Sequence, residues 1–326
     1  MTDMAEKTSS TPRHDPKVVT ALRRFAISIT VFNILGYTWF GFEQPWTWPF
    51  VALATGYTAE IALELIGARS EGRAPRFRGN GFRGLVEFLY PAHITSIALN
   101  MLTYVNDQVL VMMFGVVVAV GAKWVLRAPV RGRLRHFMNP SNLGISVILL
   151  LFPWASIAPP YHFTENVHNP IDWIIPGVII VGGTMLNGKL TNRMPLILAW
   201  AGGFALQAVV RGLVIDDISI LGGLSMMTGV AFILFSNYMI TDPGTTPSRP
   251  LSQVAFGGGV ALVYGLLMGM NIPYGIFFAT ALVCLIRGGF LWALHVVDRA
   301  RALDAARVSA AAAEAVSATG KEVAQV

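Results

Sequence analysis

The sequence predicts an all-α, polytopic membrane protein with about ten transmembrane helices. Three observations predict this class: 54% of the 326 residues are hydrophobic, only 13% are charged, and the apolar residues fall in blocks close to the length that spans a bilayer. Soluble domains carry about 25% charged residues, so this chain has too few to cover itself in water. We expect one transmembrane domain at 18–297 in contact with the lipid bilayer, a disordered tail at 1–17 and an Ala-rich tail at 298–326.

The expected transmembrane segments are apolar blocks separated by short polar stretches. In chain order they are Phe25–Phe42, Trp48–Ile66, Leu85–Leu102, Val109–Leu126, Leu143–Ile157, Trp173–Leu186, Pro195–Leu213, Ile218–Ile240, Val254–Met270 and Ile272–Val297. Several blocks are shorter than the roughly 20 residues of a typical crossing, which leaves room for tilted or broken helices. Two sets of five crossings would form an inverted 5+5 repeat, and the topology leaves this open.

The positive charges support this arrangement. If the N-terminus faces the cytoplasm and each block crosses once, 23 of the 24 Lys and Arg residues fall on the cytoplasmic side, and only Arg211 falls outside. A wrong number of crossings would break the alternation midway. We therefore expect a multi-pass protein of the cell membrane with both termini in the cytoplasm. The same bias explains the formal net charge of +6 without a nucleic-acid partner.

A polar segment on the cytoplasmic side, residues 135–144, is the first candidate site. Asn139-Pro140 favours a turn, and Ser141 or Asn142 is expected to cap the helix that follows. The backbone N–H groups at that helix start could bind an anion beside the neighbouring arginines. The alternative is a capped helix with a basic loop.

The second candidate, residues 237–250, ends the eighth block on the same side. Its prolines and glycine predict a rigid, irregular loop, and many hydrogen-bonding groups converge in it. A plain turn is the alternative to a binding or coupling role. From these two segments, the predicted cofactor-binding residues are Asn139, Ser141, Asn142, Thr241, Asp242, Thr245 and Thr246.

A substrate or ion pathway is predicted from titratable and aromatic groups elsewhere. Ionisable groups inside a membrane are functional candidates, although Arg83 and the arginines near it could simply pair with the carboxylates. The outer loop at 159–166 mixes aromatic rings, an imidazole and a carboxylate, and an ordered interfacial loop is the alternative there. The predicted pathway residues are Glu60, Glu64, Glu87, Tyr161, His162, Thr164 and Glu165.

Other chemistry finds little support in the sequence. His93 lies well inside a block and is expected to be a hydrogen-bonded packing residue, and Cys284, the only cysteine, a small core residue. No hydrolase, nucleotide-binding or zinc-protease motif is present, so catalytic residues are unknown and no metal site is expected.

The polar segments carry a resemblance to a known family. Arg135-His136-Phe137-Met138-Asn139-Pro140-Ser141-Asn142, the run from Leu151-Phe152-Pro153-Trp154 to Ala158–Asn166, and Thr241–Pro250 resemble the UnbU-type membrane proteins of enediyne biosynthesis clusters. The resemblance covers about Val19 to Trp292. It implies a part in making enediyne antibiotics and leaves the biochemical step open.

More distantly, the chain is similar to the NqrB and RnfD membrane subunits of ion-pumping electron-transfer complexes. The matching pieces are Asn139-Pro140, Phe152-Pro153 and Thr241-Asp242-Pro243. Those subunits have ten spans and carry a covalent flavin on the threonine of a Ser-Gly-Ala-Thr motif, which this chain lacks. Thr164 alone does not reproduce the motif, so the similarity implies at most a non-covalent flavin.

Three functions stay open on the sequence. The first is a redox or flavin-binding membrane subunit of enediyne biosynthesis, working with other biosynthetic or redox membrane subunits. The second is a transporter of a biosynthetic intermediate, a product or an ion, in which Glu60, Glu64 and Glu87 matter most. The third is a scaffold that recruits biosynthetic enzymes to the basic inner face.

Overall fold

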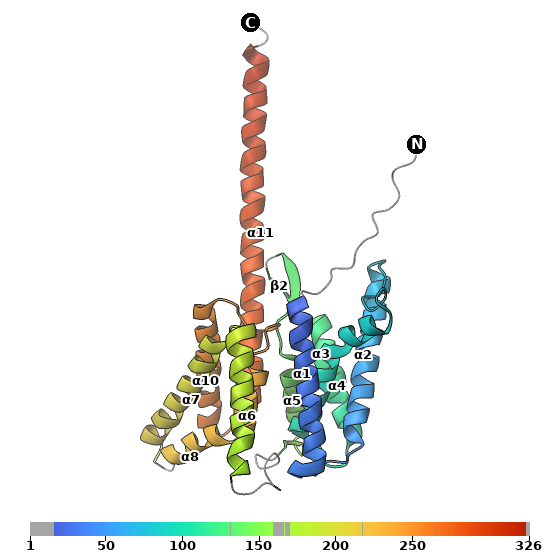
Figure 1. Ribbon diagram of the computed structural model, residues 1–326. Coiled ribbons are helices and arrows are strands. Elements are labelled where there is room, and N and C mark those ends of the chain that lie inside the picture. Colours follow the sequence, from blue (N-terminus) through green and yellow to red (C-terminus); the bar gives the residue numbers. More distant parts are fainter. Residues whose placement is uncertain (1–15, 131, 159–165, 167–169, 217, 324–326) are drawn as a thin grey trace.

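The computed structural model describes residues 16–130, 132–158, 166, 170–216 and 218–323, and it is a bundle of helices (Figure 1). The α-helices are α1 (Pro16–Leu35), α2 (Trp48–Ser70), α3 (Gly81–Leu102), α4 (Val109–Val125), α5 (Pro140–Leu151), α6 (Ile171–Met185), α7 (Met194–Val214), α8 (Ile220–Ser225), α9 (Val230–Leu234), α10 (Pro250–Gly269) and α11 (Gly275–Val323). Short π-helical or 3₁₀ turns extend some of them: η1 (Gly36–Phe40), η3 (Leu186–Leu190), η4 (Met226–Thr228) and η5 (Phe235–Met239).

Prolines mark where several helices begin. Pro49, Pro140, Pro195 and Pro250 each occupy the first or second position of a helix, namely α2, α5, α7 and α10. Proline is favoured there because its missing N–H would have had no partner inside the helix and its fixed φ suits the first turn. The sequence therefore sets these four starts locally, before any packing.

Each of the ten predicted apolar blocks contains a helix. By helix length, however, fewer than ten of them can cross a membrane. Seven described helices are long and apolar enough to cross a membrane, or eight if the α8–η4 and α9–η5 pair, bent by 64°, is one broken span. Helices α4 and α5 are shorter, at 17 and 12 residues. The chain is thus a multi-pass α-helical membrane protein, and ten crossings and an inverted repeat stay predictions.

Two small antiparallel ladders interrupt the all-α pattern, and the sequence analysis missed both. Strand β2 (Arg127–Val130) pairs with β3 (Arg133–His136), with Arg127 opposite His136. Gly132, at φ 76°, lies in the turn between them. Strand β1 (Thr103–Tyr104) pairs with β4 (Ser156–Ile157). Strands this short carry too little alternation to be detected in an apolar sequence.

The positive charges gather at one end of the bundle, which we call the basic end. The start of α1, the β2–β3 hairpin and the projecting part of α11 lie there, opposite α8 (Figure 1). The arginines at the end of α2, in the hairpin and at the start of α7 share this end, while Arg211 lies in the last turn of α7 at the other end. This is the clustering that the alternating topology predicts.

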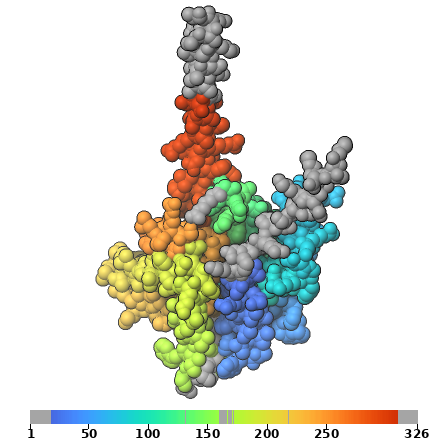
Figure 2. Space-filling view, turned by 45° about the horizontal axis from the view of Figure 1, so that its top comes forward, coloured from blue at the N-terminus to red at the C-terminus, as the bar shows by residue number. Residues whose placement is uncertain are grey.

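Helix α11 continues beyond the bundle. It runs unbroken from Gly275 to Val323, so the predicted Ala-rich tail begins as an extension of the last helix. Its projecting part stands clear of the body as a single rod (Figure 2). In Figures 1 and 2, α1 and α6 lie side by side on one face of the body.

Candidate functional site

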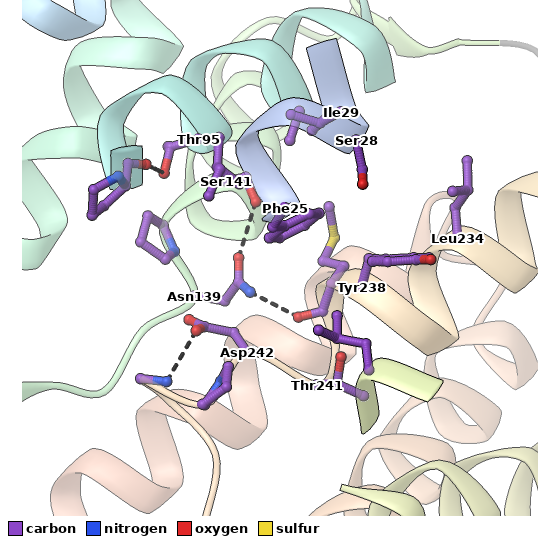
Figure 3. Close-up of a pocket in the computed structure, with 18 of the residues that line it drawn as sticks. Phe25, Ser28, Ile29, Thr95, Asn139, Ser141, Leu234, Tyr238, Thr241 and Asp242 are labelled. Carbon is purple, nitrogen blue, oxygen red and sulfur yellow. Dashed lines mark hydrogen bonds between the residues drawn. The ribbon is translucent and has the colours of Figure 1, made fainter. Parts of the chain in front are cut away.

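The two polar segments predicted from the sequence meet at the basic end. Asn139 is the N-cap of α5, where its side-chain oxygen accepts hydrogen bonds from the Asn142 N–H (3.0 Å) and the Ser141 hydroxyl (3.1 Å). Its amide nitrogen donates to the carbonyl oxygen of Met239, 2.8 Å away (Figure 3). The expectation that Ser141 or Asn142 caps α5 is wrong, because the helix already begins at Pro140 and Asn139 is the residue in front of it.

The segment after η5 is stabilised by hydrogen bonds from its own side chains. The Thr241 hydroxyl donates to the Asn237 carbonyl (2.7 Å), and the Asp242 carboxylate accepts from the Gly244 N–H (2.9 Å) and the Thr245 hydroxyl (3.1 Å). The Thr246 hydroxyl donates to the Asp242 carbonyl, 2.7 Å away. Such Asx and threonine hydrogen bonds stabilise a turn that contains prolines.

Two buried or half-buried arginines fix this turn from other helices. Arg193, in front of α7, donates to the Pro247 carbonyl (2.7 Å), and Arg287 of α11 donates to the Thr245 carbonyl (2.7 Å). Burial lowers the pKa of the Arg193 guanidinium. The sequence analysis assigned neither arginine to the site. Arg193 lies just before the seventh apolar block and Arg287 lies within the tenth, and the positive-inside rule already accounted for both.

The predicted cofactor-binding residues therefore form hydrogen bonds with other groups of the protein. Asn142 donates to the Phe277 carbonyl of α11 (2.9 Å) and so ties α5 to α11. Its side-chain oxygen is buried and has no partner among the described residues. The two segments lie at the same end, as expected, and they also contact each other, but the contacts present are structural, and cofactor binding by these residues stays a prediction.

A groove of about 3330 Å³, called the central groove below, lies next to this junction. Helices α1 and α3 line one side, and α6, η3, α9 and η5 line the other. Lining residues come from both ends of the bundle: Arg133 and Lys189 lie at the basic end, and Ile157 and Met226 at the opposite end. The central groove therefore extends along most of the depth of the bundle.

The close-up in Figure 3 shows what surrounds the middle of this groove. Ser28 and Ile29 of α1 lie across from Leu234, while Asn139 and Asp242 lie below them in the view. An aromatic pair bridges the two sides, because the ring of Phe25 stacks on that of Tyr238 with centroids 5.6 Å apart. The sequence analysis missed this pair, since the two residues lie in separate apolar blocks.

The three predicted pathway carboxylates that the structure describes are all paired with cations. Glu60 accepts from Lys123 (2.7 Å), and both side chains are about nine-tenths buried. Glu64 is fully buried and accepts from Arg73 (2.5 Å) and from the Arg76 backbone N–H (2.7 Å). Glu87 accepts from exposed Arg83 (2.8 Å).

These pairs favour the structural alternative that the sequence left open. Arg83 and the nearby Arg73 pair with Glu87 and Glu64 as that alternative expects, whereas the partner of Glu60 is a lysine of α4. Of the three carboxylates, only Glu87 lines the central groove. A pathway role for them stays a prediction.

His93 has the hydrogen-bonded packing role expected for it. One ring nitrogen lies 2.7 Å from the Thr30 hydroxyl of α1, and the other lies 2.6 Å from the Tyr57 hydroxyl of α2. His93 thus joins α1 and α2 to α3. The described residues contain no group of three or more His, Cys, Asp or Glu side chains placed to hold a metal ion. The predicted loop residues Tyr161, His162, Thr164 and Glu165 lie outside the described residues.

The helices define a multi-pass α-helical membrane protein, and the central groove runs between them. No protein-family model matches the chain, and no curated protein matches it either.

Proposed function

We propose that the protein is a component of enediyne biosynthesis in the cell membrane, with both termini in the cytoplasm, and that it binds a largely apolar small molecule in the central groove. The pathway assignment rests on the sequence resemblance at residues 135–142, 151–166 and 241–250. The binding role rests on one observation, a groove of about 3330 Å³ between helix faces that carry large apolar side chains.

The apolar lining supports a hydrophobic ligand. Binding sites for small molecules are concave, mostly apolar and equipped with a few polar groups. Here Ile94, Val178 and Phe232 line the groove, with Ser28 and Thr95 as uncharged polar groups among them. In water-free surroundings such hydroxyls can orient a ligand without the cost of burying a charge.

A tryptophan placed in the groove tests the binding role. Ser28 of α1 is exposed to the groove, so Ser28→Trp fills space that a ligand would use. Ile34→Trp is the matched control, because Ile34 is 56% exposed on the same helix and does not line the groove. We expect mass spectrometry of solvent extracts to find a small molecule that co-purifies with the wild type and the control and is depleted from Ser28→Trp. Equal extracts from all three proteins would contradict the proposal.

The residues predicted to hold a flavin do not fit that cofactor well. The amide of Asn139 and the hydroxyls of Thr241, Thr245 and Thr246 all hydrogen-bond within the protein. We therefore derive no redox step through them. A purified protein with flavin absorption in the visible range would restore the redox proposal, and a preparation that stays colourless with added flavin would remove it.

Transport is the second candidate function, and the depth of the central groove favours it. Its lining includes Lys189 at the basic end and Met226 at the other, so a ligand inside it meets both sides of the bundle. Of the predicted pathway carboxylates in the described residues, Glu87 is the one on this route. Transport predicts slower export of the pathway product in Ser28→Trp cells than in Ile34→Trp cells, and unchanged export would count against it.

A further inference from the structure

We propose that the central groove takes a long-chain acid, a mostly apolar chain ending in a carboxylate or phosphate, with its anionic head at the basic end. This inference rests on the proposed function, since it requires that the groove is a ligand site. It adds the charge and the orientation of the ligand.

Cations surround the groove at the basic end and have little to neutralise them. Seven Lys and Arg residues of the described chain line the groove, against two acids, Glu87 and Asp242. Glu87 is paired with Arg83, and Asp242 accepts hydrogen bonds from its own turn. Five of the seven cations form no ion pair within the described part of the chain: Arg23, Arg78, Arg133, Arg135 and Lys189.

These five residues come from separate elements that meet at one opening. Arg23 is on α1, Arg78 on the loop between α2 and α3, Arg133 and Arg135 on β3, and Lys189 on η3. The positive-inside rule explains why cations lie on this face. It does not require them to line one opening from several sides, as these do.

Among the described residues, the rest of the groove carries no charged side chain. All nine charged lining residues lie at the basic end or in the junction beside it, and deeper positions are apolar, such as Ile94, Ala98 and Val178. An acid at the end of a hydrocarbon chain matches this distribution, because the head keeps ionic partners while the chain leaves water. The N-terminus of α5 reaches the same opening at Pro140 and Ser141, and its dipole also favours negative charge.

Cations at the basic end that lie outside the groove do form ion pairs. Arg73 and Lys123 lie at the same end and are paired with Glu64 and Glu60. The sequence thus supplies acids where cations are part of the helix packing and supplies few around the groove, where two acids face seven cations among the described residues. We commit to a free long-chain acid rather than a bilayer phospholipid, since the proposed function concerns a pathway molecule.

A photoreactive probe tests the inference directly. The protein in nanodiscs of neutral phosphatidylcholine is labelled with diazirine-bearing palmitic acid and, separately, with the matching alcohol, and labelled peptides are mapped by mass spectrometry. We expect the acid to label α1, α3 and α6 more than the alcohol does. The double variant Arg133→Gln/Arg135→Gln should lose labelling by the acid roughly fivefold, the effect of removing two exposed ionic partners. High salt should weaken labelling of the wild type by the acid alone.

The control is Arg69→Gln/Arg249→Gln, which removes the same charge from exposed residues that do not line the groove. It should label like the wild type. Equal labelling of the groove by acid and alcohol, at both salt concentrations, overturns the inference but leaves the binding role intact. Displacement of the acid by equimolar phosphatidylglycerol overturns the choice of a free acid. Absence of groove labelling of the wild type by either probe contradicts the proposed function itself.

Discussion

The walls of the bundle and the groove between them use different side chains. In the wall formed by α7 and α10, a Cβ added to Gly257 would meet the carbonyl oxygen of Leu196, and one added to Gly203 would lie 2.7 Å from the Cβ of Ala261. Along the groove, α1 presents Ile27 and Val31, which are 57% and 50% exposed. Small residues let two backbones touch, whereas bulky ones hold helices apart.

This difference has a physical reason in the membrane. Lipid tails are as apolar as leucine, so apolar side chains alone do not drive helices together. Close backbone packing and polar pairs do, and the walls have both, through the glycines of α7 and α10 and the buried pairs of Glu60 and Glu64. The groove has neither along most of its length, which leaves it open to a ligand.

Removing the carboxylate of Glu64 should have the largest effect on stability. Its side chain is fully buried and accepts from Arg73 and from the Arg76 backbone N–H. Glu64→Ala removes the acceptor of the Arg76 N–H and leaves Arg73 with exposed Glu71 as its remaining ion-pair partner, so we expect a loss of about 3 kcal/mol in the free energy of unfolding. Thermal unfolding in a fixed detergent measures it. Glu71→Ala is the control, because Glu71 also pairs with Arg73 but is exposed. Equal shifts in Tm would show that burial of Glu64 does not matter.

Two adjacent glycines test the close packing of the wall. Gly257→Ala places a methyl group against the backbone of α7, and we expect a loss of about 2 kcal/mol because the helices must move apart. Gly258 has no heavy atom within 4 Å of an added Cβ, so Gly258→Ala should be neutral or stabilising. Thermal unfolding of both variants gives the difference. If both alanines are tolerated alike, the contrast between walls and groove loses its basis.

The sequence predicts the helices well because each local signal is strong. Apolar blocks, starting prolines and arginine positions place the segments from α1 to α11, and Asn139-Pro140 and Thr241-Asp242 mark the two loops that meet. The sequence predicts poorly which side chains contact each other. The pairing of Glu60 with Lys123 joins residues 63 apart, and only the packing of α2 against α4 brings them together.

The groove itself could not be predicted from the sequence. Its aromatic bridge joins Phe25 to Tyr238 across most of the chain. An apolar residue that faces a groove looks the same in sequence as one that faces lipid. Paired and unpaired cations also look the same in sequence. Arg73 and Arg133 both fit the positive-inside rule, although only Arg73 has an ion pair among the described residues.

A large side chain in the groove should disturb stability far less than a methyl group in the wall. We expect Ser28→Trp to change the free energy of unfolding by no more than about 0.5 kcal/mol, because the new ring enters open space. Ile34→Trp should change the free energy of unfolding equally little. Thermal unfolding of these two variants and of Gly257→Ala under the same conditions compares their stability losses. A loss in Ser28→Trp as large as that of Gly257→Ala would mean that the groove is closed in solution.

The smallest expected effect is a pH dependence from His136, which lies at the edge of the groove against Gly244. Burial is the main cause of its lowered pKa; Lys123 and Arg127 lower it further, while Asp242 and Glu60 oppose the shift. As pH falls below about 6.5, the unfolded chain binds a proton at this imidazole before the folded chain does. The free energy of unfolding should therefore fall with pH until the folded pKa is passed, and then stay level.

His136→Gln should flatten this decline, and Tm measured in steps from about pH 7.5 to about pH 5 checks it. His295→Gln, at an exposed histidine of α11, is the matched control and should keep the decline of the wild type. A decline that survives in His136→Gln would show that another group titrates. A decline lost in that variant alone would assign the pH dependence to the junction beside the groove, because burial of the neutral imidazole against Gly244 would then contribute to stability there.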